Sequence, residues 1–121
     1  LNEMQIEDPT RIHVELHKLH NNYRSYNFNI EDLFPEIDPM HVRICRVYIN
    51  YYDYDNTRIT IDLYSNLDYY ILEQYKSIIK GWAKSHGYHF KTDLNWETFS
   101  IYFNIEDVFE LFDINPEDLK K

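Results

Sequence analysis

The chain has 121 residues, a formal net charge of −9 and an apolar content of 44%. This length predicts a single domain over residues 1–121, and the apolar content excludes wholesale disorder. The single cysteine, Cys45, excludes an intramolecular disulfide and is typical of a reducing compartment, so we expect a cytoplasmic protein. No apolar run approaches the roughly 18 residues that a membrane span needs, which predicts no membrane partner. The negative charge disfavours direct nucleic-acid binding and favours a protein partner with a basic surface.

The first predicted element is an N-terminal helix from about Pro9 to Arg24. Asp8 suits the N-cap of a helix and Pro9 suits its first turn. Apolar side chains then recur at helical spacing and would form the buried stripe of this helix: Ile12, Leu16, Leu19 and Tyr23.

A seven-residue pattern, Phe28–Phe34, recurs almost letter for letter as Phe103–Phe109. In each copy an asparagine suits the N-cap of a helix, and the acidic residues after it suit the positive end of the helix dipole. We interpret the repeat as two similar helix starts in one domain. The first helix is short because two prolines follow it, and the second is expected over Ile105–Phe112.

Alternating side chains predict an antiparallel hairpin from two strands, Val42–Tyr52 and Arg58–Tyr64. One face of the first strand carries Cys45, Val47, Ile49 and Tyr51, and the apolar side chains of the second strand alternate in the same way. A long helix over Leu67–Ser85, a short strand over Tyr88–Thr92 and a strand over Thr98–Phe103 complete the prediction. The expected fold is α+β: an antiparallel sheet of three to four strands with a long helix across one face, plus N-terminal and C-terminal helices.

Three histidines form the only candidate for a metal site. On the predicted N-terminal helix, His13, His17 and His20 would lie on one stripe, and neutral imidazoles bind Zn²⁺. Because His13 and His20 would be about 10 Å apart along the axis, a real site would need one adjacent pair with a ligand from elsewhere. The alternative interpretation is that the three histidines lie along the border of the buried face, where amphipathic side chains are common. We expect no cofactor.

Motifs for catalysis are scarce. Cys45 lies on the inward face of its strand, which is typical of an inert buried thiol, and no serine lies in a nucleophile elbow. Only 2 residues are glycine, which leaves few places where the backbone could wrap a phosphate. The 12 tyrosines, with many asparagines and isoleucines, indicate AT-rich coding, which is common in mobile elements. The sequence therefore favours binding over enzymatic function.

Charge and tyrosine patterns predict the binding surfaces. Four lysines and no acids lie between Lys76 and Lys91, whereas eight acids and no lysine or arginine lie between Asp93 and Leu119. Tyrosine and arginine, which are enriched at protein interfaces, point outward from the predicted sheet. The predicted partner-binding residues are Arg46, Tyr48, Tyr52, Arg58, Tyr64, Tyr102, Glu106, Asp107, Glu110 and Asp113.

From these surfaces we predict a non-catalytic inhibitor or immunity-type protein that occupies a basic surface of a partner, as a nucleic-acid mimic does. Carboxylates on short helices can imitate phosphates, because a basic groove responds to electrostatic potential. Two alternatives stay open: a small metal-dependent enzyme or sensor that uses the three histidines, and a nucleic-acid binder that uses the strip from Lys76 to Lys91. Ordinary solvated charge runs and ordinary strand-forming tyrosines would give the same patterns.

Overall fold

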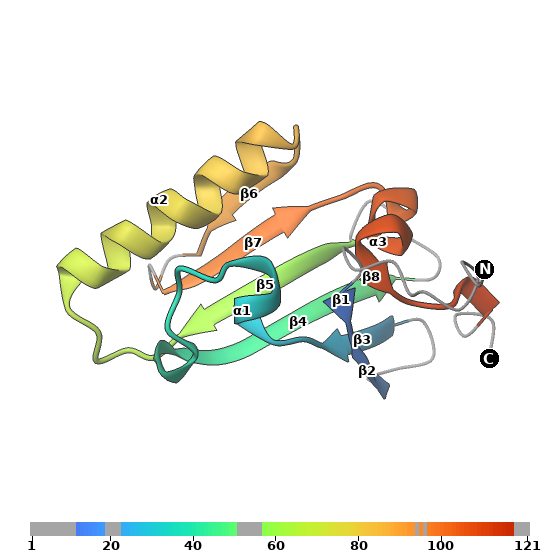
Figure 1. Ribbon diagram of the computed structural model, residues 1–121, viewed down its shortest axis with the longest axis horizontal. Helices are drawn as coiled ribbons and strands as arrows, with labels where there is room; N and C mark the ends of the chain where they lie inside the picture. The colour runs from blue at the N-terminus through green and yellow to red at the C-terminus, as the bar shows by residue number, and fades with distance from the viewer. Residues whose placement is uncertain (1–11, 19–22, 51–56, 94, 96, 118–121) are drawn as a thin grey trace, which may run out of the picture.

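The structure, a computed structural model, describes residues 12–18, 23–50, 57–93, 95 and 97–117. Its main element is a six-stranded antiparallel sheet in the order β2-β3-β4-β5-β7-β6 (Figure 1). The strands of this sheet are β2 (Glu15–Lys18), β3 (Tyr23–Asn27), β4 (Val42–Asn50), β5 (Arg58–Leu63), β6 (His89–Thr92) and β7 (Thr98–Tyr102). Two short strands, β1 (Ile12–His13) and β8 (Phe112–Asp113), pair in parallel beside it.

The predicted hairpin is confirmed at the centre of the sheet. β4 and β5 pair antiparallel, with Val47 opposite Ile59 and Cys45 opposite Ile61. Val47, Ile59 and Ile61 are fully buried, whereas Tyr48, on the other face, is half-buried. The alternation therefore separates one apolar face from one polar face, as a half-buried antiparallel sheet requires.

All three helices lie on the apolar side of the sheet: α1 (Ile30–Leu33), α2 (Tyr69–Ser85) and α3 (Ile105–Leu111) (Figure 1). α2 buries Tyr75, Ile79 and Ala83 in the core. Trp82 joins this helix to its neighbours, because its ring meets Phe34 after α1 at 5.4 Å and Phe103 after β7 at 6.4 Å. None of the described helices is long and apolar enough to cross a membrane.

The predicted N-terminal helix is wrong. Residues 12–18 and 23–27 form β1, β2 and β3, and the predicted cap, Asp8-Pro9, lies outside the described residues. Ile12 and Leu16 are spaced as on a helical stripe, but Ile12, Val14 and Leu16 also alternate as in a strand. The sequence therefore supports both periods. In the structure β3 pairs with β4 from Tyr23 to Asn27 and satisfies backbone groups that would otherwise form an open edge.

The expected sheet of three to four strands is also wrong, because β2 and β3 extend it to six. The helix expected over Ile105–Phe112 is α3, which ends at Leu111, and the described chain continues from it directly into β8. The repeat does begin two helices, since Asn29 and Asn104 are the N-caps of α1 and α3, but neither side chain makes a capping hydrogen bond. Asp68 caps α2 instead, with its carboxylate accepting from the backbone N–H of Tyr70 at 2.9 Å.

Candidate functional site

The predicted partner-binding residues do not form one surface. Arg46, Tyr48, Arg58 and Tyr102 lie on the polar face of the sheet, opposite the helices. The predicted acidic residues, Glu106, Asp107, Glu110 and Asp113, lie on α3 and β8, on the helical side. Tyr64 follows β5 at the end of the sheet, and Tyr52 lies outside the described residues. A partner would have to wrap around the molecule to contact all of them.

The polar face of the sheet is held by contacts between its own side chains. The Arg58 guanidinium lies over the Tyr48 ring, 4.8 Å from its centroid, and Arg46 donates to Asn27 Oδ1 at 2.9 Å. Asp62 accepts hydrogen bonds from Arg43 and from the Thr98 hydroxyl. Half-buried tyrosines and arginines in such contacts already stabilise the sheet, so their abundance needs no partner to explain it.

The acidic helix α3 follows Phe103, whose ring lies 4.5 Å from the ring of Tyr88 after α2. Burial, and then the charges of Asp107 and Glu110, raise the pKa of the Tyr88 hydroxyl. The exposed Lys80 and Lys84 lie on α2.

The histidines no longer share a helical stripe. His13 lies in β1 and His17 in β2, while His20 falls outside the described residues. His13 Nδ1 is 3.8 Å from a carboxylate oxygen of Asp113 across the β1–β8 pair. Among the residues that the structure describes, no group of three or more His, Cys, Asp or Glu side chains could hold a metal ion.

Cys45 is a buried thiol within β4, as the sequence predicts. Burial, reinforced by the charges of Glu31 and Asp32, raises its pKa well above the ordinary value for a thiol. Because the thiolate is the nucleophile, this environment suppresses its reactivity.

Large apolar side chains gather on the surface at one end of the molecule. Among the described residues, four of the five exposed large hydrophobic side chains belong to the segments around η2 (Pro39–His41) and the start of α2: Met40, Tyr64, Tyr69 and Tyr70, which we call the tyrosine end. Met40, Tyr69 and Tyr70 are 82%, 74% and 79% exposed. Scattered exposed apolar residues are normal, but a gathered patch marks an interaction surface.

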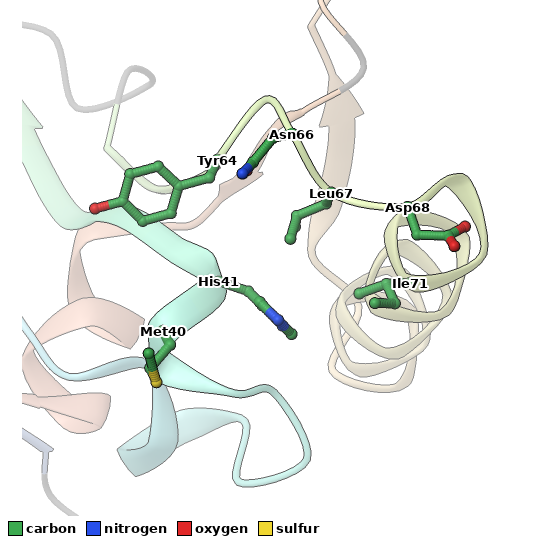
Figure 2. A pocket seen from close by; sticks show the side chains of 7 residues that line it. All are labelled: Met40, His41, Tyr64, Asn66, Leu67, Asp68 and Ile71. Atoms are coloured by element: carbon green, nitrogen blue, oxygen red, sulfur yellow. The ribbon is translucent and has the colours of Figure 1, made fainter.

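A hollow of about 610 Å³ opens between η2 and the first turns of α2. Met40, Tyr64, Leu67 and Ile71 supply apolar lining, and the polar side chains at its wall are His41, Asn66 and Asp68. Figure 2 shows His41 projecting from the η2 side toward Leu67 and Ile71. A second hollow shares Leu67 and is lined by Tyr69, so the segment before α2 forms a ridge between two concave surfaces.

The His41 side chain is fixed from behind by Tyr75 of α2. The Tyr75 hydroxyl accepts the backbone N–H of Asp38 at 3.2 Å and lies 2.7 Å from His41 Nδ1. Tyr75 is buried, and its ring meets the imidazole at a centroid distance of 5.7 Å. The loop before η2, the imidazole and α2 are thereby joined through one hydroxyl.

No family model, curated protein or solved structure matches this chain.

Of the predicted binding residues, only Tyr64 belongs to the tyrosine end. A signal for Tyr70 is present in the sequence: at 100° per residue, it points away from the side of α2 that carries Tyr75 and Ile79, whereas Tyr69 lies at the flank of that side.

Proposed function

We propose that this protein is a non-catalytic binding factor of the inhibitor or immunity type, which occupies a basic surface of a partner protein through its tyrosine end. Four exposed side chains carry this proposal: Met40 and Tyr64, which line the hollow, and Tyr69 and Tyr70 on the adjoining first turn of α2. Tyrosine and methionine are enriched at protein interfaces, and tyrosine offers a large contact area with few torsions to freeze.

The charges around the tyrosine end favour a basic partner. Residues 35–42 and 64–75 carry four carboxylates, Glu36, Asp38, Asp68 and Glu73. The cations Arg43 and Lys76 lie one residue beyond these ranges, and Arg43 is paired with Asp62. Glu36, Asp38 and Asp68 are exposed. Complementary charge around an apolar centre speeds association and selects the partner, while the apolar centre supplies most of the affinity.

The test is partner capture with wild-type protein and two variants, followed by measurement of the dissociation constant. Tyr69→Ala with Tyr70→Ala is expected to weaken binding of the identified partner at least tenfold, because interface tyrosines are frequent hot spots. The matched control reverses the charges of Glu106, Asp107 and Glu110 to lysine on α3, which lies away from the tyrosine end, and is expected to change binding less than threefold.

Added salt should weaken the wild-type complex, because the partner surface is expected to be basic. Partner binding that is indifferent to salt and unchanged by the two tyrosine substitutions would contradict the proposal. Loss of binding on α3 reversal alone would transfer the docking surface to the acidic helix and would contradict the use of the tyrosine end.

A further inference from the structure

The hollow beside α2 combines apolar walls with one oriented hydrogen-bond donor. Binding pockets commonly have this composition, in which a few placed polar groups fix the orientation of an apolar ligand. Met40, Leu67 and Ile71 give the hollow its aliphatic lining, and the His41 ring extends into it (Figure 2). The orientation of the proton on His41 decides what the hollow recognises.

The contacts of the Tyr75 hydroxyl determine that proton. The oxygen accepts the N–H of Asp38, and its single proton then points to His41 Nδ1, at 2.7 Å. A neutral imidazole whose Nδ1 accepts a hydrogen bond carries its own proton on Nε2. The reverse arrangement would leave the hydroxyl proton without an acceptor among the described contacts. Nε2–H is therefore the donor that faces the hollow, and it fits a carbonyl oxygen.

The charges at the rim exclude an anion as the ligand of this donor. The carboxylate of Asp68 already caps α2 by accepting from Tyr70 N, so the positive end of the helix dipole is satisfied. Asp38 caps η2 in the same way, with its carboxylate accepting from Met40 N at 2.9 Å. Both aspartates are exposed at the rim, where carboxylates favour cations over carboxylates or phosphates.

We propose that the hollow binds an extended segment of the partner, placing one aliphatic side chain between Met40, Leu67 and Ile71 while His41 Nε2 donates to a main-chain carbonyl of that segment. Lysine or arginine residues that flank the aliphatic residue face Asp38 and Asp68. This inference rests on the proposed function, since it names the chemistry of the partner at the tyrosine end.

Three short peptides test the proposal by NMR titration of the ¹⁵N-labelled full chain. The probes are the N-acetylated, C-amidated tripeptides Lys-Leu-Lys, Lys-Ala-Lys and Glu-Leu-Glu. Lys-Leu-Lys is expected to saturate shifts confined to η2 and residues 64–71, and each of the other two to bind at least tenfold more weakly. Equal binding of all three, or shifts centred elsewhere on the chain, would overturn the proposal.

Two variants separate the donor from the charge. His41→Phe keeps a ring but removes Nε2–H, and is expected to weaken Lys-Leu-Lys at least fivefold, whereas the control His89→Phe, on β6, leaves binding unchanged. Asp38→Asn with Asp68→Asn keeps both helix caps, because asparagine caps as well as aspartate, but removes the rim charge. It is expected to reduce the preference for Lys-Leu-Lys over Glu-Leu-Glu from tenfold to less than threefold. An unchanged affinity or preference overturns the assigned role.

The outcomes for the two proposals are distinguishable. If the peptides fail to bind the hollow but a partner complex is lost on substitution of Tyr69 and Tyr70, the inference about the hollow falls and the proposed function stands. If the peptides bind as expected but no partner depends on these tyrosines, the proposed function falls and the hollow remains a peptide-binding site.

Discussion

The hydroxyl of Tyr75 is expected to stabilise the fold by joining three segments, and Tyr75→Phe removes it while keeping the ring. Two hydrogen bonds are lost, one from the Asp38 N–H and one to His41 Nδ1. A typical intramolecular hydrogen bond contributes about 0.5–1.5 kcal/mol net. We therefore expect the free energy of unfolding to fall by about 1–2 kcal/mol, which for a chain of this size lowers the melting temperature by about 4–8 °C.

Urea denaturation followed by circular dichroism measures this change, and an unchanged slope with denaturant would show that the unfolding reaction is the same. Tyr70→Phe is the matched control on the same helix: its ring is 79% exposed, so its effect should stay within about 0.5 kcal/mol.

A double-mutant cycle isolates the contact between Tyr75 and His41. Tyr75→Phe, His41→Ala and the double variant are expected to give a coupling free energy of about 1 kcal/mol, because the two side chains share one hydrogen bond. A coupling of zero, or a Tyr75→Phe variant as stable as the wild type, would refute a stabilising hydrogen bond between the two side chains.

The two glycines predict substitutions of opposite sign. Gly81→Ala lies within α2 and has nothing near an added Cβ, so it should stabilise the protein by about 0.5–1 kcal/mol. Gly87→Ala should destabilise the protein by about 1 kcal/mol, because the φ of Gly87 is +78°. Urea titrations that show the same sign for both substitutions would contradict this. Cys45 should resist a thiol reagent at neutral pH until urea unfolds the chain, and rapid labelling of folded protein would count against its burial. Asp107→Asn should lower the pKa of Tyr88, as measured by NMR of labelled tyrosine; an unchanged pKa would place this carboxylate elsewhere.

The sequence was sufficient for the centre of the fold, where local pattern and tertiary structure agree. Strands β5 and β7 follow strict alternation, as does β4 from Cys45 onward, after a register shift between Val42 and Ile44. The predicted strand over Thr98–Phe103 differs from β7 by a single residue. The long helix ends as predicted at Ser85, with Gly87 in the left-handed conformation after it. Each of these segments has only one periodicity that buries its apolar side chains.

The N-terminal segment could not be assigned in the same way, because two periods fit it. Ile12 and Leu16 are separated by one helical turn, but Val14 between them is also apolar, as a strand requires. The deciding factor is a distant one: the edge of β4 is satisfied by β3, and β2 then pairs with β3. Pairing over such sequence separation leaves no local signature, so the helical hypothesis for the three histidines failed with the helix.

The tyrosine end was missed because its parts are not adjacent in the sequence. Met40 and His41 follow Pro39 in a short 3-10 turn, whereas the opposite wall of the hollow begins more than twenty residues later, after β5. The backbone hydrogen bond from Tyr64 N to His41 O, at 3.1 Å, brings the two walls together. Only the pairing of β4 with β5, which places Val42 opposite Leu63, sets this contact.

The two aspartates at the rim connect the fold of this end to the function proposed for it. Asp38 and Asp68 begin the two helical elements that form opposite walls of the hollow, and each carboxylate accepts a backbone N–H two residues later. Serine or threonine could supply the same cap without a charge. Aspartate at both positions adds negative charge at the mouth of the hollow, and neither carboxylate forms a salt bridge among the described residues. Such uncompensated carboxylates are expected where a basic partner supplies the positive charge on binding. For this reason the charge of each aspartate must be tested separately from its helix-capping hydrogen bond.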